Sequence, residues 1–502
     1  MPAPAVLVTA TDGGSASGAL GIVVLAAGEG TRMKSSRPKV LHAFAGRTML
    51  GHVLAATEPL AATATVVVVG HGREQVTDHL RELDASAVAA VQEEQLGTGH
   101  AVAVALVAAA ASGDADFDTV LVLPGDAPLL RATTLSALLD EHRAAGAAAT
   151  MLTSELEDPT GYGRVLRAPD GSVAAVVEER DATPGQRLVT EVSALVYAFD
   201  AARLRDALAR IGSDNAQGEQ YLPDVVGILR ADGLDVRAVL APAQETAGVN
   251  DRVQLAQAHR ALTDRLLEQH MRGGVTVLDP SSTWVGTDVR IERDVTLLPG
   301  VHLVGTTTIA TGAVIGPDCT ITDTSVGAGA VVNRAVTDNV TIGPRASVGP
   351  FAYLRGGAEL AEAAKVGTFV EVKNSVIGTR SKVPHLSYVG DATIGTGSNI
   401  GAATIFANYD GVRKNRSQVG DDVRIGSDTT VVAPVRIGNG AYTGAGTVVR
   451  EDVPADALAV SMGKQRNLPG RGASARSQQS ASSRNKPAPT PPAPTEPSEG
   501  SS

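Results

Sequence analysis

The stretch that decides the fold runs from Ile291 to Gly316 and reads IERDVTLLPGVHLVGTTTIATGAVIG. Its apolar residues return at every sixth position, namely Ile291, Leu297, Leu303, Ile309 and Ile315. A helix would repeat after about 3.6 residues and a half-buried strand after about 2, so neither explains this pattern. A period of six is typical of a parallel β-helix built from hexapeptides, in which each apolar side chain points inward at one short face.

The same spacing continues almost to the C-terminal tail. It returns at Ile321, then at Ile342, Val348, Leu354, Leu360, Val366 and Val372, and again at Ile425, Val431, Ile437 and Val449. A single coil cannot bury its own interior, so the coils must stack on one another. Scattered valine and isoleucine in an ordinary β-domain is the alternative, and three runs that each keep the sixfold spacing argue against it.

Length and composition limit the function classes. The chain has 502 residues, enough for two or three domains, and 43% of them are hydrophobic. Its net charge of −11, without a basic run, argues against a nucleic-acid partner. Cys319 is the only cysteine, which excludes an intrachain disulfide and favours a reducing compartment. The longest apolar run, 101–111, is too short to cross a bilayer, and we see no signal peptide, so we expect a cytoplasmic protein without a membrane partner.

A glycine-rich turn marks the start of the N-terminal half. An apolar run over 21–25 predicts a buried strand, and the sequence LAAGEGTRM follows it over 25–33. Glycines after a strand allow backbone N–H groups to approach phosphates without a Cβ in the way. Arg32 and Lys39 add positive charge at this turn. We therefore expect a phosphate-binding site here.

Strands and helices alternate beyond this turn. The patterns predict strands over 65–70 and 119–123 and a helix over 73–83, an order that favours a parallel sheet covered by helices. Ligands of such sheets lie at the carboxyl ends of the strands, where Asp126 is placed. A carboxylate beside a phosphate site is a natural Mg²⁺ ligand, although a turn or helix-capping aspartate is the plainer alternative.

The pattern divides the chain into five segments. We expect a disordered extension over 1–20, a nucleotidyltransferase domain over 21–248 and a helical linker over 249–272. The β-helix should occupy 273–467, and a tail rich in serine and proline over 468–502 should be disordered.

Taken together, the glycine-rich turn, the sequence PKVLH over 38–42, the sequence QLGTGH over 95–100 and the hexapeptides resemble one bacterial enzyme family. It is that of the bifunctional N-acetylglucosamine-1-phosphate uridylyltransferase and glucosamine-1-phosphate N-acetyltransferase, and the resemblance covers roughly residues 21–467. It implies a Rossmann-like nucleotidyltransferase domain, a helical linker and a left-handed parallel β-helix that forms a homotrimer. It also implies acetyl transfer from acetyl-CoA to glucosamine 1-phosphate, followed by Mg²⁺-dependent uridylyl transfer from UTP to N-acetylglucosamine 1-phosphate with release of pyrophosphate. The product is a precursor of the cell wall.

In the uridylyl half, the resemblance implies a site that works mainly by positioning and charge neutralisation, because a sugar phosphate oxygen attacks the α-phosphorus of UTP. The implied residues are Leu25, Ala26, Gly28, Arg32, Lys39, Gln92, Gly97 and Thr98 for the nucleotide, Gly163, Glu178, Ser193 and Asn250 for the sugar, and Asp126 and Asn250 for Mg²⁺.

In the β-helix half, His385 matches the catalytic histidine, and a neutral imidazole suits proton removal from the attacking amine. The sequence NYDG over 408–411 interrupts the hexapeptide spacing, and expelled loops are where function is expected. The implied contacts are Arg355, Lys373, Tyr388 and Asn399 for the sugar phosphate, and Ala402, Asn408, Tyr409, Ser427 and Ala445 for acetyl-CoA.

Five features depart from the family pattern. Ser193 stands where the family has asparagine, and Leu195 stands where it has glycine, so we expect weaker sugar binding in the uridylyl site. Gly356 replaces a proline after Arg355, which loosens that turn. Met462 replaces an arginine, and a terminal segment with tryptophan is missing, so we expect weaker acetyl-CoA binding.

Two other functions stay open from the sequence. The chain could be a nucleotidyltransferase with one activity whose β-helix only assembles subunits, although His385 and Lys373 argue against this. It could also be a scaffold that binds a nucleotide sugar without catalysis. Asp126 and Asn250 argue against that, because a scaffold does not need metal ligands.

Overall fold

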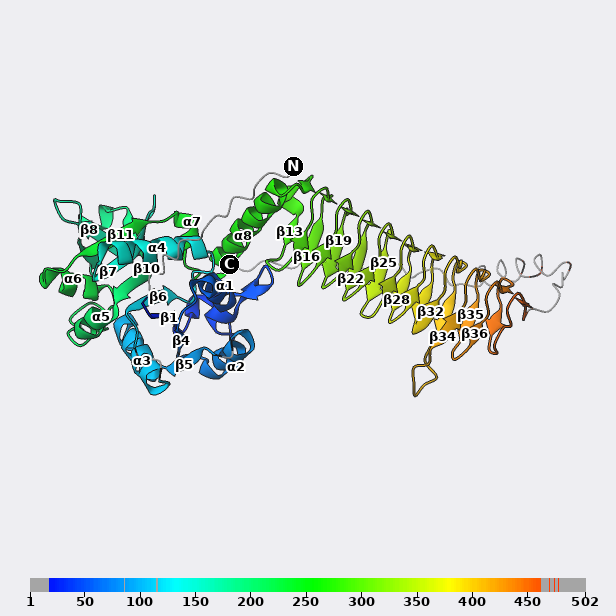
Figure 1. The fold of residues 1–502 in the computed structure, drawn as a ribbon, viewed down its shortest axis with the longest axis horizontal. Helices are drawn as coiled ribbons and strands as arrows, with labels where there is room; N and C mark the ends of the chain where they lie inside the picture. The colour runs from blue at the N-terminus through cyan, green and yellow to red at the C-terminus, as the bar shows by residue number, and fades with distance from the viewer. Residues whose placement is uncertain are drawn as a thin grey trace, which may run out of the picture.

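The computed structural model describes residues 18–84, 86–113 and 116–461 and the single positions 469, 474 and 477. An α/β domain lies at one end, a long β-helix extends from it, and helix α8 (Arg252–Arg272) lies between them (Figure 1). The first strand, β1, begins at Leu20, within the segment expected to be disordered. The rest of that prediction, over 1–17, lies outside the described residues, as do Met462 and nearly all of the tail.

The α/β domain is built on a nine-stranded sheet whose main path runs β11-β7-β10-β6-β1-β4-β5. Strand β1 pairs in parallel with β4 and β6, whereas β10 runs antiparallel to β6 and β7. The strands are β1 (Leu20–Ala26), β4 (Ala64–Val69), β5 (Val88–Val91), β6 (Thr119–Pro124), β7 (Ala149–Glu155), β8 (Arg164–Arg167), β9 (Val173–Val177), β10 (Glu191–Asp200) and β11 (Val236–Leu240).

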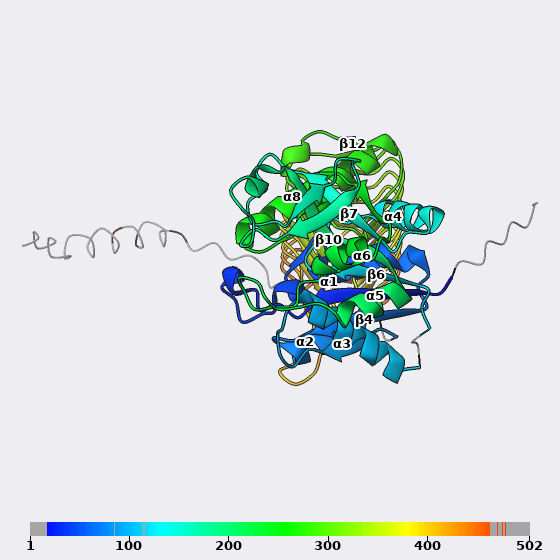
Figure 2. The same ribbon diagram turned by 90° about the vertical axis from the view of Figure 1, so that its left-hand side faces the viewer.

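Helices cover both faces of this sheet, which Figure 2 shows from the end of the molecule with the β-helix behind it. Apolar side chains of α3 (Thr98–Ala111), α5 (Ala201–Leu208) and α6 (Asp224–Ala231) join one core cluster. Those of α1 (Met49–Thr57), α2 (Arg73–Leu83) and α4 (Ala132–Ala145) join the other. The predicted sandwich of helices around a largely parallel sheet is confirmed, and the helix predicted over 73–83 is α2.

The hexapeptide region forms three long parallel sheets, the predicted left-handed β-helix. The first contains β12 (Thr276–Val277), β15 (Thr296–Leu297), β18 (Val314–Ile315), β21 (Val331–Val332), β24 (Ser347–Val348), β27 (Lys365–Thr368) and β30 (Lys382–His385). The second contains β13 (Trp284–Val285), β16 (Val301–Val304), β19 (Cys319–Thr322), β22 (Ala335–Asp338), β25 (Ala352–Arg355), β28 (Glu371–Lys373), β31 (Tyr388–Gly390), β33 (Ile405–Ala407), β35 (Thr430–Val432) and β38 (Val448–Val449). The third contains β14 (Arg290–Ile291), β17 (Thr308–Ile309), β20 (Ser325–Val326), β23 (Thr341–Ile342), β26 (Glu359–Leu360), β29 (Val376–Ile377), β32 (Ala392–Ile394), β34 (Ser417–Val419) and β36 (Arg436–Ile437).

The residues of the sixfold pattern form the interior of this β-helix. Leu297 pairs with Ile315 and Ile291 with Ile309, each partner lying one coil further along the chain. Most of these side chains are fully buried in one continuous core. Threonine and serine hydroxyls at the corners satisfy backbone carbonyls, as Thr307 Oγ1 does by donating to Val304 O at 2.7 Å. Stacking of identical positions thus replaces the thick core of a globular domain.

Helix α8 packs against both halves. Its Leu262 lies in a cluster with Phe44 of the α/β domain, and its Leu267 belongs to the β-helix core. The His259 ring lies 4.6 Å from Trp284 of the first coil, measured between ring centroids. An ion pair of 2.5 Å joins Arg47 to Asp288 across the junction. Within the described part of the chain, no helix is both long and apolar enough to cross a membrane.

Candidate active sites

A cavity of about 250 Å³ lies at the carboxyl ends of β1 and β6. It contains seven of the eight residues predicted to bind the nucleotide. They are Leu25, Ala26, Gly28, Lys39, Gln92, Gly97 and Thr98, and the cavity is also lined by Gln95, Asp126, Leu195 and Glu219. Arg32, the eighth, lies outside the lining in the 3-10 turn Thr31–Met33.

One wall of this cavity is fixed by Gly97 and Thr98. Gly97 has φ +106°, and a Cβ there would lie 2.6 Å from Gln220 O, so only glycine fits. Gln92 Nε2 donates to Gly97 O at 3.1 Å. The Thr98 hydroxyl accepts a hydrogen bond of 2.9 Å from Leu222 N. The wall is therefore rigid before a ligand arrives.

Lys39, Asp126, Asn250 and Arg32 converge beside the cavity. The Lys39 ammonium group forms an ion pair with the Asp126 carboxylate and also donates to Asn250 Oδ1 at 3.3 Å. Arg32 Nη2 donates to the same amide oxygen at 2.9 Å, across 218 residues of sequence. A backbone hydrogen bond also brings the two predicted metal ligands together. Val249 N, next to Asn250 in the chain, donates to Asp126 O at 2.8 Å.

The oxygens of Asp126 and Asn250 suit Mg²⁺, which binds oxygen ligands and usually takes one or two from protein and the rest from water and phosphate. No group of three or more histidine, cysteine, aspartate or glutamate side chains able to hold a metal occurs among the residues that the structure describes. Two protein oxygens beside a phosphate-sized cavity fit a metal delivered with a nucleotide, and the assignment stays a prediction.

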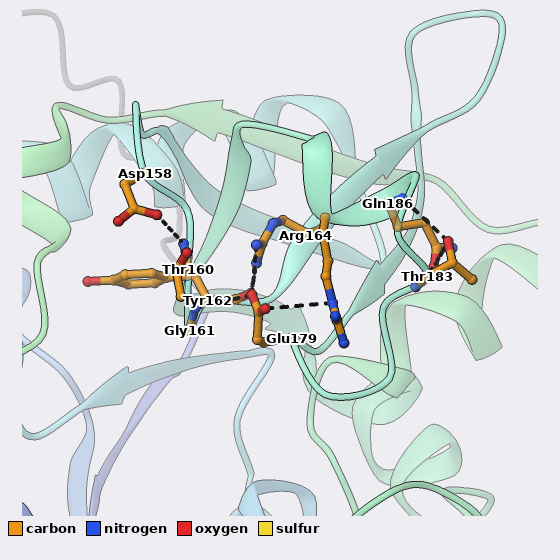
Figure 3. A network of polar contacts seen from close by, with 9 residues as sticks. Asp158, Thr160, Gly161, Tyr162, Arg164, Glu179, Thr183 and Gln186 are labelled. Atoms are coloured by element: carbon orange, nitrogen blue, oxygen red, sulfur yellow. Dashed lines mark hydrogen bonds and ion pairs between the residues drawn. The ribbon is translucent and has the colours of Figure 1, made fainter.

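A buried arginine, Arg164, links residues that neighbour the predicted sugar residues Gly163 and Glu178, and Figure 3 shows its contacts. Arg164, only 1% exposed, forms an ion pair of 2.7 Å with Glu179 and donates to Tyr162 O. Glu179 also accepts from Gly161 N at 3.1 Å. This network ties the loop before β8 to the segment after β9, so Gly163 and Glu178 are fixed relative to each other.

Glu178 is a half-buried carboxylate in this arrangement. Burial raises its pKa, and the nearby negative charges of Asp224 and Asp181 raise it further. A carboxylate that is poorly solvated gains from a hydroxyl donor, which a sugar can supply. The geometry is compatible with the predicted sugar contact, which stays a prediction.

Ser193 and Leu195 differ in whether they line the cavity. The Ser193 hydroxyl bonds to Tyr197 Oη at 2.8 Å and accepts from Leu195 N at 3.3 Å, and it does not line the cavity. Leu195 does line the cavity. In this structure the Ser193 hydroxyl therefore forms its hydrogen bonds with other residues of the protein. The predicted contact between Ser193 and the sugar stays a prediction.

The sequence reasoning missed Tyr162 in this site. Burial raises the pKa of the Tyr162 hydroxyl, and the charge of Asp126 raises it further, whereas a hydrogen bond with the backbone of Gly248 lowers it. Gly248 lies beside both predicted metal ligands, since a Cβ there would be 3.8 Å from Asp126 Oδ1 and 4.0 Å from Asn250 Nδ2. The only signal of Tyr162 in the sequence is that it directly precedes Gly163, and a tyrosine beside a glycine is too common to be specific.

The second site lies on the outer surface of the β-helix. Arg355 of β25 is the register partner of Lys373 in β28, and Arg355 Nη1 donates to Glu371 Oε1 at 2.8 Å. On the next two coils, Asn408 Nδ2 donates to Asp391 and lies 3.4 Å from Tyr388 Oη. The predicted residues Arg355, Lys373, Tyr388 and Asn408 therefore lie on adjacent coils of one face.

Lys414 belongs to this group and was also missed. It lies in the loop between β33 and β34 that protrudes from the β-helix in Figure 1. Contact with Lys373 lowers the pKa of the Lys414 ammonium group. Two touching lysines beside Arg355 form a positive site suited to a phosphate. The interrupted hexapeptide spacing is the sequence signal for Lys414, because Lys414 lies in the same loop as the residues 408–411 that were singled out.

His385 starts a line of small residues along one corner of the β-helix. Its carbonyl accepts from Ala403 N at 3.2 Å, Ala402 O accepts from Asp428 N at 2.7 Å, and Ser427 O accepts from Gly446 N at 2.8 Å. His385, Ala402, Ser427 and Ala445 therefore occupy equivalent corners of successive coils. The His385 side chain is exposed at the end of β30.

The last two predicted residues flank this line. Asn399 forms bridges with Lys382 and Arg424 on the neighbouring coils. Tyr409 is exposed on the protruding loop, where its hydroxyl donates to Gly411 O at 2.6 Å. An extended ligand lying along the corner from His385 to Ala445 would contact small side chains and backbone, as the prediction for acetyl-CoA requires.

Comparisons with known proteins agree with both halves. The N-terminal half matches the MobA-like NTP transferase domain over residues 22–223, and residues 416–451 match the bacterial transferase hexapeptide family of six repeats. The bifunctional protein GlmU of Thermobifida fusca is 57% identical over 91% of this chain and 94% of its own. Those of Mycolicibacterium vanbaalenii and Streptomyces avermitilis are 56% and 53% identical over 89% of this chain, covering 92% and 93% of their own lengths.

These relatives span both halves and the helix between them at 53% to 57% identity. The resemblance inferred from the sequence motifs, and with it a chain that carries two transferase activities, is confirmed. The chain belongs to the family of bifunctional GlmU proteins.

Proposed function

We propose that the two transfers occur at two separate sites of the chain. Acetyl transfer from acetyl-CoA to glucosamine 1-phosphate takes place on the β-helix around His385. Uridylyl transfer from UTP to N-acetylglucosamine 1-phosphate takes place in the cavity beside β1. The observation that carries this proposal is the convergence of Lys39, Asp126, Asn250 and Arg32 beside a cavity already lined by the glycine-rich turn.

In the uridylyl site, the chain supplies position and charge. The glycine-rich turn leaves backbone N–H groups free to approach phosphates, and Lys39 and Arg32 neutralise their charge. Asp126 and Asn250 would hold Mg²⁺, which supplies further charge neutralisation on the phosphates when bound. Gly163 and Glu178 orient the sugar so that its phosphate oxygen lies in line with the α-phosphorus.

In the acetyl-transfer site, Arg355, Lys373 and Lys414 hold the sugar phosphate. His385 Nε2 or Nδ1 takes a proton from the amine as nitrogen attacks the thioester carbonyl. The carbon–sulfur bond then breaks, and the departing sulfur takes a proton from the imidazolium, so that CoA leaves as the thiol. The corner from Ala402 to Ala445 holds the extended acetyl-CoA. A reactive group on a β-helix corner is exposed to solvent, so a neighbouring subunit is the natural cover.

We propose a homotrimer for this reason. Phe351 and Phe369 stack with ring centroids 5.4 Å apart on successive corners and are 56% and 58% exposed. Leu386, 59% exposed, follows on the next corner directly after His385. A row of exposed apolar side chains is typical of an interaction surface. A Phe369→Glu variant should sediment as a smaller species than the unmodified protein. We place the assembly in the cytoplasm, where UTP and acetyl-CoA are available.

The test of the two-site proposal is a pair of variants measured in two assays. Asp126→Ala should lower Mg²⁺-dependent pyrophosphate release by about 10³-fold and leave acetyl transfer unchanged. His385→Ala should lower acetyl transfer by about 10²- to 10⁴-fold and leave pyrophosphate release unchanged. If either variant lowered both activities while remaining folded, the two-site proposal would be wrong.

A further inference from the structure

Leu195 has a backbone conformation that leucine normally avoids. Its φ is +55°, in the left-handed region that favours glycine. It lies in β10 at a point where the pairing with β7 shifts between Ser193 and Tyr197. Such bulges re-aim side chains, and a strained residue other than glycine persists only where its surroundings hold it in place, often at a functional site.

The bulge turns the Leu195 side chain into the wall of the uridylyl cavity. Leu195 lines the cavity together with Leu25, Pro124 and Asp126, and it packs on the same apolar core as Leu25. Leu25 and Pro124 are register partners at the ends of β1 and β6, and β6 is the neighbour of β10. The ends of β1 and β6 and the middle of β10 therefore form one apolar wall of the cavity that Asp126 also lines.

The hydrogen bonds of Ser193 also hold this bulge in place. Its hydroxyl is bonded to Tyr197 Oη at 2.8 Å and to Leu195 N at 3.3 Å, and its own N–H donates to Gly163 O at 2.9 Å. Tyr197 is fully buried, so this polar chain is fixed. Along β10, Leu195 thus lies between the hairpin that carries Gly163 and the cavity that carries Asp126.

We propose that Leu195 is a specificity-determining residue of the uridylyl site, limiting the size of the sugar 1-phosphate that fits between the nucleotide and the Gly163 hairpin. The inference rests on the proposed uridylyl transfer and adds to it the basis of the choice of sugar. An isobutyl group takes up room and offers no hydrogen bond, so a bulky polar substituent facing it is both crowded and left without a partner. Glycine at position 195 would remove the strain of the positive φ and would free the space that the isobutyl group fills.

The test compares kcat/KM for pyrophosphate release with three acceptors: N-acetylglucosamine 1-phosphate, glucosamine 1-phosphate and glucose 1-phosphate. Leu195→Gly should raise the preference for the N-acetylated sugar over the two smaller ones by roughly tenfold, as expected for a change of a few methylene groups in a pocket. The KM for UTP should stay within about twofold. Acetyl transfer by the same preparation verifies that the protein is intact.

Two more variants separate side-chain size from backbone strain. Leu195→Ala shortens the side chain but keeps the strained φ, whereas Leu195→Asn keeps most of the length and tolerates this conformation. If size decides, alanine behaves like glycine, and asparagine, which relieves the strain but fills nearly the same room, does not reach the preference of glycine. If backbone strain decides, alanine, which keeps the strained φ, behaves like leucine and the inference is overturned.

Two outcomes separate this inference from the proposed function. Pyrophosphate release with an unchanged order of acceptors in all three variants would overturn the inference alone. If the unmodified protein released pyrophosphate with none of the acceptors while still transferring acetyl groups, the proposed uridylyl activity would be refuted, and the inference with it.

Discussion

The α/β domain and the β-helix assemble their sites by opposite routes. In the α/β domain, Arg32 bonds to Asn250 across 218 residues, and the site depends on the closure of the whole sheet. In the β-helix, Arg355 meets Lys373, and Asn408 meets Asp391, between one coil and the next. A site between neighbouring coils needs only local order, whereas a site at the end of a sheet needs the entire domain.

The two regions also bury different polar groups. The buried histidines His42, His52 and His142 all lie in the α/β domain. The buried polar side chains of the described β-helix coils are mostly threonine and serine, together with Asp391 and Asn408. Hydroxyl groups do not titrate between pH 4 and 8, so the comparison predicts an α/β domain sensitive to acid and a β-helix sensitive mainly to packing.

The largest expected effect comes from a charge inside the coils. Val372 is fully buried, with Leu354 and Val389 as its register partners. Val372→Asp should destabilise the β-helix by more than about 4 kcal/mol, because an unpaired carboxylate replaces a packed side chain. Val372→Ala, the matched control, should cost only about 2 kcal/mol. Acetyl transfer should be lost in the aspartate variant and pyrophosphate release retained. A parallel loss of both activities would show that the two regions unfold as one unit.

The same contrast explains what the sequence could predict. The sixfold spacing from Ile291 onward directly identifies the inward positions, because each coil repeats the environment of the one before. The glycine-rich turn also predicts a phosphate site from local sequence. Tyr162 could not be placed in this way, and Leu195 was assigned to the uridylyl site only through the resemblance to the family. The position of Tyr162 near Asp126 depends on how a loop folds over the sheet, and that of Leu195 depends on a bulge that periodicity does not reveal.

The next effect concerns the ion pair between the buried Arg164 and the partly exposed Glu179 (Figure 3). Arg164→Met should lower the stability in chemical denaturation, because it removes the guanidinium group that ties Glu179 to the backbone of Tyr162. It should also raise the KM for the sugar phosphate, since Gly163 loses its support. Arg187, half-exposed and 3.7 Å from the same carboxylate, provides the control, and Arg187→Met should cost less than about 1 kcal/mol. Equal costs in chemical denaturation would contradict the role given to burial.

The third expected effect concerns the loss of stability of the α/β domain in acid. Burial lowers the pKa of His52 from 6.5 to about 4, and its Nε2 lies 3.0 Å from Phe44 O. Since the unfolded chain binds the proton more readily, the stabilisation is complete above pH 6.5 and is lost as the pH falls toward 4. His52→Gln should reduce this acid-induced loss by about 3 kcal/mol. His71→Gln, which removes an exposed histidine from the same domain, is the control. Unfolding curves at a series of pH values give the free energy of unfolding for both variants. The same pH dependence in the His52 and His71 variants would contradict the role given to the buried His52.

The smallest effect has opposite signs in stability and in function. The pKa of Glu178 is raised by burial and by Asp224 and Asp181, so its ionised form is penalised in the folded state. Glu178→Gln should therefore raise the Tm at pH 7 to 8, and the gain should shrink as the pH falls through the raised pKa toward the value of the unfolded chain, where both proteins are neutral. The KM for the sugar phosphate should rise by roughly tenfold, because an amide is a weaker acceptor for a hydroxyl than a carboxylate is. Asp170→Asn is the control, since this exposed carboxylate of the same domain has its pKa lowered by bonds to Ser172, and its loss should not stabilise the protein. A lower Tm for the Glu178 variant at neutral pH would mean that the Glu178 charge stabilises the fold. Glu178 would then favour both sugar binding and stability, and the expected opposition between the two effects would be refuted.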